Sequence, residues 1–222
     1  MNPNTFVTAL SEIELKDVFN PYRHFCHTHD LQDGPIVRRK NLNLYLQVLE
    51  QQEVDTIWMG RDLGYRGGRR TGLALTDEYH LSQMGLAYPG VIAERATKGP
   101  AVSERTASEI WGILTKLTQP PLLWNVFPFH PHELGSEFTN RKFSKVELDT
   151  VTELNHQLIS WLGIKRIICL GRDAASYATT FAIDVECVRH PSYGGVKEFR
   201  EAMYKLYTKD LHQANFHNQL FE

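Results

Sequence analysis

The chain has 222 residues, 42% of them hydrophobic, which is enough for one domain with a substantial apolar core. Its formal net charge of −2 argues against a protein that coats nucleic acid through charge alone, because such binding depends on many Lys and Arg contacts to phosphates. The sequence has no run of roughly 20 apolar residues that would cross a bilayer, and Met1-Asn2-Pro3-Asn4 is not a basic start followed by an apolar run. We therefore expect a soluble, cytoplasmic protein with no membrane partner.

Residues 1–52 are expected to form a helical or irregular prefix, with helical apolar spacing over 6–15 and 42–49. The rest of the chain alternates between short apolar runs, typical of buried parallel strands, and amphipathic helical patterns. Strands are predicted at 56–59, 122–124, 166–170 and 185–188, and helices at 103–117, 148–162, around 174–177 and at 199–211. This alternation predicts right-handed βαβ crossovers. We expect an α/β fold in a single domain over 1–222, with a small parallel sheet of about four strands flanked by helices on both faces and a core at 54–200.

Cysteine and histidine usage gives no sign of a metal centre. The three cysteines are too few and too scattered for a disulfide framework, and no CxxC pair indicates zinc or an iron–sulfur cluster. His24, His27 and His29 lie close together, but nothing downstream completes a ligand pattern. No metal site is expected.

Three predicted strands are each followed by one polar residue with catalytic chemistry. Asp62 follows the first strand, Asn125 the second and His190 the last. Because the carboxyl ends of parallel strands meet at one edge of a sheet, where such folds bind ligands, we expect the three side chains to converge. An acid, an amide and an imidazole in one crevice are typical of an active site.

The segment after the first predicted strand is basic and rich in glycine. It holds Arg61, Arg66, Arg69 and Arg70 against the single acid Asp62, interleaved with three glycines. A flexible basic loop beside a strand end is suited to clamp phosphates, so we expect it to contact nucleic acid.

Taken together, these segments resemble the uracil-DNA glycosylase superfamily over about residues 54–200, in the family's order. Gly60–Tyr65 aligns with the family's water-activating loop GQDPYH, and the same spacing brings Gly72–Leu75 onto its GLAF motif. Leu123–Asn125 matches the strand end that carries the base-reading asparagine, and Leu170–Ala174 resembles WGSHA. His190–Ser192 is the HPS signature.

Two departures from the family concern the base pocket. Gly64 stands where the uracil-specific branch has a tyrosine that excludes C5 substituents, and Leu75 stands where that branch stacks a phenylalanine on the base. In this respect the loop is similar to the GINPG loop of the mismatch-directed branch, although it keeps the acid Asp62. Either Tyr65 replaces the lost gate, or the pocket accepts a base larger than uracil.

The resemblance implies a role for each residue of the site. Asp62 would orient water and stabilise positive charge on the sugar, and a neutral His190 would stabilise negative charge on the departing base. Asn125 would read the edge of the base, with Gly64, Tyr65 and Leu75 lining its pocket. The residues expected to contact DNA are Arg66, Arg69, Arg70, Gly171, Arg172, Ser192 and, as a wedge in the vacated space, Tyr193. No metal or organic cofactor is required, and no obligate protein partner is inferred.

The sequence therefore predicts a monofunctional DNA glycosylase that flips a pyrimidine nucleotide and leaves an abasic site. Its substrate would be uracil or a C5-modified pyrimidine. In the latter case, the protein would act in defence against phage by removing bulky modified bases, such as glucosylated hydroxymethylcytosine, from viral DNA. Two alternatives stay open: a non-catalytic module that binds damaged or mismatched DNA, and an unrelated Rossmann-like enzyme that acts on a small nucleotide.

Overall fold

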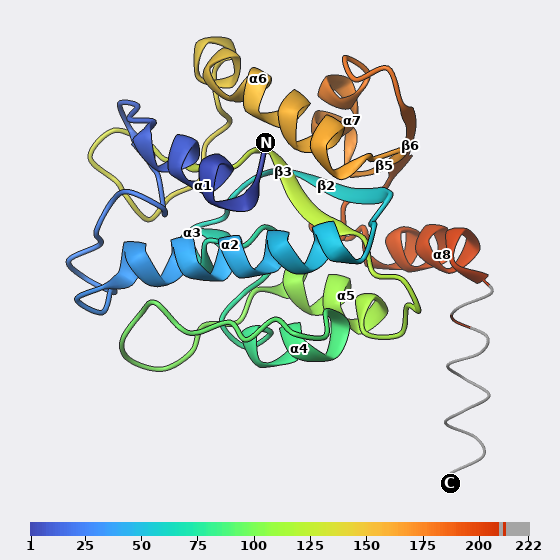
Figure 1. Ribbon diagram of the computed structural model, residues 1–222, viewed down its shortest axis with the longest axis horizontal. Coiled ribbons are helices and arrows are strands. Elements are labelled where there is room, and N and C mark those ends of the chain that lie inside the picture. Colours follow the sequence, from blue (N-terminus) through green and yellow to red (C-terminus); the bar gives the residue numbers. More distant parts are fainter. Residues whose placement is uncertain (209–210, 212–222) are drawn as a thin grey trace, which may run out of the picture.

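A sheet of four parallel strands, in the order β3–β2–β5–β6, forms the centre of the computed structural model, which describes residues 1–208 and 211 (Figure 1). The α/β fold with four parallel strands confirms the prediction. In chain order the elements are α1 (Pro3–Glu12), β1 (Val18–Phe19), α2 (Gly34–Gln51), β2 (Thr56–Asp62), α3 (Gly68–Thr71), η1 (Leu81–Gln83), α4 (Met84–Ala87), α5 (Arg105–Leu114), β3 (Leu122–Phe127), β4 (His130–Pro131), α6 (Lys145–Leu162), β5 (Arg166–Leu170), α7 (Arg172–Ala178), β6 (Asp184–Val188) and α8 (Val196–Leu206).

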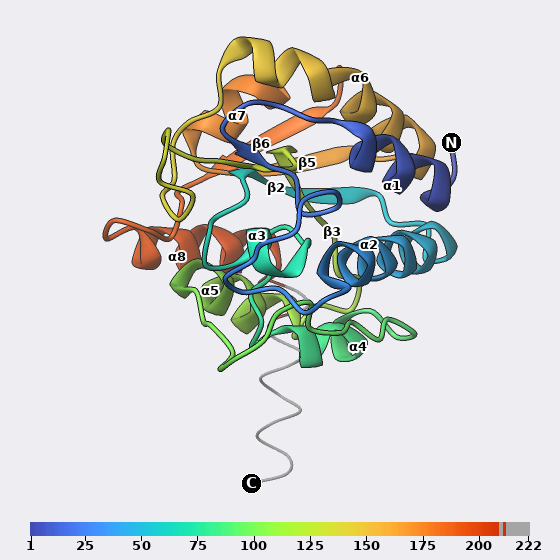
Figure 2. The ribbon, with the colours of Figure 1, turned by 90° about the vertical axis from the view of Figure 1, so that its left-hand side faces the viewer.

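Helices cover both faces of the sheet. Figures 1 and 2 show α6 and α7 on one face and α2, α5 and α8 on the other, while α1 packs against both α2 and α6. β2, β3 and β5 are mostly apolar because both of their faces are covered, and all six residues of β3 are buried. The edge strand β6 is more exposed and carries Asp184 and Glu186. The N-terminal helices belong to the same hydrophobic core, which includes Phe6 and Leu10 of α1 and Leu46 of α2.

The direction of strand addition reverses beside β2, which is where folds of this kind bind ligands. The chain passes from β2 to β3 on one side and then returns to β5 on the other, so the direction of strand addition reverses between β2 and β5. At such a reversal the loops leaving the two strands diverge and open a ligand-binding crevice at the carboxyl ends. Within the sheet, Gly60 lies opposite Asn125 and Asp62 opposite Phe127.

Local sequence signals explain where the long helices begin and end. Ser144 and Glu147 form a capping box at the start of α6, and Gly163 ends this helix in the left-handed conformation at φ 67°. The structure also contains a short antiparallel pair, β1 with β4, which the sequence analysis did not predict. Strands of two residues carry no periodic pattern that could indicate them.

Within residues 1–208 and 211, every helix is either too short or too polar to cross a bilayer.

Candidate active site

Asn125 presents an unpartnered amide at the carboxyl end of the sheet. Its side chain is 1% exposed, and Oδ1 accepts no hydrogen bond from any described residue. A buried carbonyl oxygen without a partner costs about 1–3 kcal/mol, so such a group calls for an explanation. The amide lies against Gly60 of β2, where a Cβ atom would come closer than 3.0 Å to Oδ1. Glycine at position 60 therefore makes room for the amide.

Leu75 lies beside this amide, as the expected base pocket requires. Its Cδ2 atom is 3.1 Å from the position that a Cβ on Gly60 would take, so Leu75 and Asn125 share the same side of β2. Leu75 has φ 55°, in the left-handed region that a leucine rarely adopts. Strain of this kind gathers at functional sites, where the surrounding structure holds it in place.

Asp62 ends β2, and its carboxylate is paired with the neighbouring Arg61. The side chain of Asp62 is 8% exposed, and Arg61 Nε donates to Asp62 Oδ2 at 2.5 Å. Burial raises the pKa of Asp62, and the bond from Arg61 opposes this rise. Arg61 also reaches Asp173 at 3.3 Å, and Lys142 binds the other oxygen of Asp173 at 2.9 Å. The guanidinium thus bridges the ends of β2 and β5.

His190 follows β6, and its hydrogen bonds fix the position of its proton. The backbone N–H of Ser192 donates to His190 Nδ1 at 3.2 Å, and the Ser192 hydroxyl lies 2.7 Å from the same nitrogen. Because a backbone N–H can only donate, Nδ1 is the acceptor and the proton of the neutral ring is on Nε2. Nε2 has no hydrogen-bond partner among the described residues, so its N–H is available to a ligand.

The pKa of His190 depends on its burial and on Arg61, which also affects the pKa of Asp62. Burial lowers the pKa of His190, and the positive charges of Arg61 and then Arg189 lower it further. Arg61 therefore acts on both residues, and its positive charge favours the neutral form of the imidazole. Gly171, with φ 95°, lets the end of β5 approach the ring, since a Cβ there would lie 3.2 Å from that of His190.

Two of the loop arginines require a correction. Arg69 and Arg70, expected to contact DNA, are buried at 2% and 6% exposure and bind internal partners. Arg69 Nη1 lies 3.0 Å from Nδ1 of His130, and Arg70 Nε donates to a carboxylate oxygen of Glu78 at 2.9 Å. His130 lies 61 positions from Arg69, and Glu78 lies 8 positions from Arg70, so no motif within the loop indicates either partner. Both arginines anchor the loop and are removed from the set of phosphate contacts.

The Arg69 partner His130 is a structural residue. His130 Nε2 lies 2.8 Å from the carbonyl oxygen of Thr139, to which it donates, so Nδ1 faces Arg69 as an acceptor. Burial, together with the charge of Arg69, lowers the pKa of His130 to about 3. The ring is therefore neutral and holds the loop after β3 against the loop after β2.

The other expected DNA contacts lie on the surface around the site. Arg66 and Arg172 are exposed and make no ion pair with a described residue. Tyr193 is 96% exposed with φ 52°, three residues beyond His190. Tyr65 is half-buried, and its backbone N–H donates to Asn140 Oδ1 at 3.1 Å.

Glu104, which the sequence analysis did not select, lies against the loop that follows Asp62. Its Oε1 is 3.1 Å from the position of a Cβ on Gly64, and a Cβ on Gly67 would come closer than 3.0 Å to Oε2. Glu104 stands 42 positions beyond Asp62 and directly before α5, as the N-cap residue. No local motif links it to the site, so only the fold could identify it.

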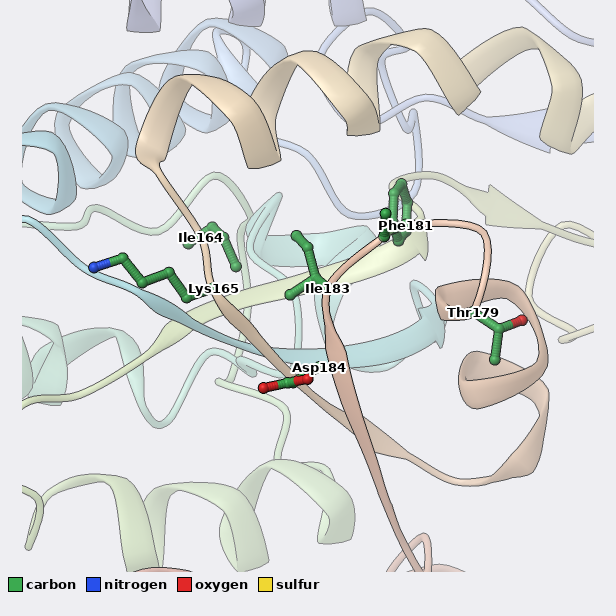
Figure 3. A pocket seen from close by; sticks show the side chains of 7 residues that line it. Ile164, Lys165, Thr179, Phe181, Ile183 and Asp184 are labelled. Carbon is green, nitrogen blue, oxygen red and sulfur yellow. The ribbon is translucent and has the colours of Figure 1, made fainter.

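A separate surface hollow lies at the other end of the strands. Figure 3 shows its lining, which includes Lys165 before β5 and Asp184 at the start of β6. The hollow measures about 650 Å³ and is widely open. It belongs to the amino ends of β5 and β6, whereas Asp62, Asn125 and His190 gather at the carboxyl ends, so it has no part in the candidate site.

Comparison with known proteins bears on the fold. No protein-family model and no curated protein matches the chain. Among solved structures, the chain is similar to the crystal structure of wild-type SMUG2 from Pedobacter heparinus, with a TM-score of 0.58 and 14% identity. The alignment covers 99% of this chain and 98% of that one. The likeness extends over the whole fold, and at this identity it shows the fold alone.

Proposed function

We propose that this protein is a monofunctional DNA glycosylase of the uracil-DNA glycosylase superfamily, which flips a pyrimidine nucleotide and hydrolyses its N-glycosidic bond. The observation that carries the proposal is the buried amide of Asn125, whose oxygen has no partner among the described residues, at the edge of the sheet where the strand-end residues Asp62 and His190 are also found. Its fold is that of SMUG2, itself a member of that superfamily, which supports the assignment.

The amide of Asn125 has the chemistry to read a pyrimidine edge. A carboxamide offers an acceptor oxygen next to a donor nitrogen, which matches the N3–H and O4 groups of uracil. A base bound there would give Oδ1 the donor that the free protein lacks. Cytosine mismatches this orientation of the amide but fits the rotated one, so Asn125 alone does not separate the two bases.

Asp62 and His190 stabilise opposite charges as the bond breaks. The electron pair of the C1′–N1 bond leaves with the base, so positive charge develops on the sugar and negative charge on the base. The Asp62 carboxylate stabilises the sugar cation and orients a water, whose oxygen joins C1′. The Nε2–H of His190 donates to O2 of the departing base. One proton of the water is finally carried by the base, so the products are an abasic site and the free pyrimidine.

Phosphate contacts would supply the energy that base flipping costs, a few kcal/mol. Arg66 is an exposed cation on the loop that follows β2, and Arg172 is an exposed cation at the first position of α7, after β5. Ser192 and the backbone at Gly171 complete this set. Tyr193 is exposed and would fill the space that the base leaves, as an aromatic wedge.

Uracil and C5-modified pyrimidines are the two substrate classes. Gly64 brings no side chain of its own to the pocket, which favours the larger class and with it a role in defence against phage DNA. A non-catalytic module that binds damaged or mismatched DNA is the alternative of another class. The pairing of Asp62 with a neutral His190 favours catalysis, since base binding alone needs neither charge arrangement.

The test uses duplex oligonucleotides that carry uracil, a thymine mispair, 5-hydroxymethylcytosine or its glucosylated form, followed by alkaline cleavage of abasic sites. We expect strand breaks at one or more of these bases, and a fall in rate of about 10²–10³ for Asp62→Asn and for His190→Ala. Asp173→Asn is the matched control, since it removes an exposed carboxylate that also contacts Arg61. Tight binding of the same DNA without any strand break would assign the protein to the non-catalytic class.

A further inference from the structure

Glu104 places a second carboxyl group at the site, and its backbone is held firmly. The Glu104 N–H donates to Oδ2 of the fully buried Asp77 at 2.6 Å. The other oxygen of Asp77 binds His80 at 2.6 Å, so the anchor is itself fixed. The side chain then extends from the start of α5 to the loop after β2, where its two oxygens lie over Gly64 and Gly67.

The carboxyl group has no structural partner. None of the described residues donates a hydrogen bond to Oε1 or Oε2, and the N–H of Gly67 is bonded to Gly64 O at 3.3 Å instead. A carboxylate that held the loop in place would accept hydrogen bonds from backbone N–H groups of the loop, such as that of Gly67. Because Gly64 and Gly67 have no side chains, there is room beside the loop for the Glu104 carboxyl. Gly64 is two residues from Asp62.

The charged groups around Glu104 affect which ligand groups its carboxyl can bind. Burial raises the pKa of Glu104, Asp77 and Asp62 raise it further, and Arg66 opposes them. A half-buried carboxyl without a donor is poorly solvated and gains from a ligand that supplies one. Asn125 and His190 account for the N3 and O2 groups of a pyrimidine and for one contact at the C4 group, which leaves a substituent at C5 or the second hydrogen of an amino group at C4 as the donor.

We propose that Glu104 is a specificity-determining residue, whose carboxyl accepts a hydrogen bond from a hydroxyl or amino substituent of the flipped base. The proposal depends on the function proposed above. The sequence analysis treated the space beside Gly64 as open to a C5 substituent. In the structure this space is bordered by the Glu104 carboxyl, which is a hydrogen-bond acceptor. The pocket favours a base with a polar substituent over one with a methyl group of similar size.

The experiment compares five bases in one duplex context: uracil, thymine, 5-hydroxymethyluracil, cytosine and 5-hydroxymethylcytosine. Thymine and 5-hydroxymethyluracil differ by one hydroxyl, which tests a donor at C5. Uracil and cytosine differ in the donor at C4 and also at N3, which Asn125 reads, so a C4 donor is identified by the change in this ratio that Glu104→Leu causes. The variants are Glu104→Leu, which keeps the approximate size without an acceptor, and Glu104→Gln, which keeps one acceptor oxygen. Glu109→Leu, on the same helix but paired with Arg200, is the control.

We expect wild-type kcat/KM to be at least about tenfold higher with the donor than without it in one of these pairs, since a hydrogen bond to a charged group is worth this much. Glu104→Leu abolishes that ratio, Glu104→Gln keeps part of it, and the control leaves it unchanged. Unaltered ratios in Glu104→Leu would overturn the proposal. So would an equal loss on all five bases, which would mean that Glu104 acts only through the charge of Asp62.

A binding measurement separates this proposal from the proposed function. Duplexes with 2′-fluorinated nucleotides resist cleavage, because fluorine disfavours positive charge on the sugar, and their Kd reports recognition without chemistry. If the wild-type protein cleaves none of the five bases and none of those in the assay of the proposed function, the proposed function fails. A Kd preference for the donor base that Glu104→Leu removes would still support Glu104 as the reader, and the lack of any such preference would overturn it.

Discussion

Gly60→Ala tests whether the amide of Asn125 is the reader of the site. A Cβ on residue 60 would come closer than 3.0 Å to Asn125 Oδ1, whereas ordinary contacts of such atoms begin at 3.4 Å. The amide oxygen must therefore retreat by more than 0.4 Å. The second neighbour, Leu75 Cδ2 at 3.1 Å, closes the other side of the space and limits where the new methyl group can go.

The expected effect on activity is larger than the effect on stability. A displacement of about 1 Å at a positioned group costs about 10² in rate, so we expect kcat/KM to fall by about 10- to 100-fold. Overpacking costs about 1–3 kcal/mol of unfolding free energy, and replacing a strand glycine returns about 0.5–1 kcal/mol. The melting temperature should therefore fall by less than about 10 °C, and the protein should remain folded at the assay temperature.

A double-mutant cycle with Asn125→Ala gives the decisive comparison. If the methyl group acts by moving the amide, Gly60→Ala in the Asn125→Ala background lowers kcat/KM no further. An equal fall in both backgrounds would refute the reasoning, because Gly60 would then act on another part of the site. Gly112→Ala in α5 is the control, since nothing lies within 4 Å of its Cβ position.

Three further predictions concern charge and DNA contact. Arg61→Ala shifts the acid limb of the pH–rate profile to higher pH: Arg61 lowers the pKa of Asp62 and of the site histidine, and catalysis needs both groups deprotonated. An unmoved limb in kcat/KM would contradict this. Arg70→Ala destabilises the fold by about 2 kcal/mol in urea titrations, because its bond to the buried Glu78 carboxylate is lost while Arg95 still pairs with that group. Arg172→Ala instead reduces the salt slope of DNA binding by about one and leaves stability unchanged. The reverse pattern would restore Arg70 as a DNA contact. Tyr193→Ala slows excision from duplex more than from single strands, where no stack has to be opened, and equal losses would exclude a wedge.

The positions of the strand-end residues could be predicted because they depend on local pattern. Short apolar runs that end in polar residues identify buried parallel strands, and parallel strands bring their carboxyl ends to one edge. Asp62 and His190 accordingly share Arg61 as a neighbour. The roles of these residues in catalysis stay predictions.

Burial of charge could not be predicted from the same sequence. Four arginines in a glycine-rich loop look alike, yet two of them turn inward to partners such as His130 and Glu78, while Arg66 stays exposed. Glu104 is missed for the same reason, since its place over Gly64 depends on how α5 packs. Tertiary contacts between distant segments decide which charges stay in water, and no motif encodes them.

Among the described residues, four non-glycine residues have positive φ, and two of them, Leu75 and Tyr193, belong to the proposed site, whereas Asp17 and Glu53 lie outside it. Leu75 and Tyr193 both have positive φ, at 55° and 52°, which costs about 1–3 kcal/mol for each residue. A glycine at either position would remove that cost. Leu75 lies beside the Asn125 amide and Tyr193 stands exposed beyond His190, so strain is stored both in the proposed pocket and at the proposed wedge. We therefore expect Leu75→Gly and Tyr193→Gly to lower activity without lowering the free energy of unfolding by as much, and the roles of both side chains toward a flipped nucleotide stay predictions.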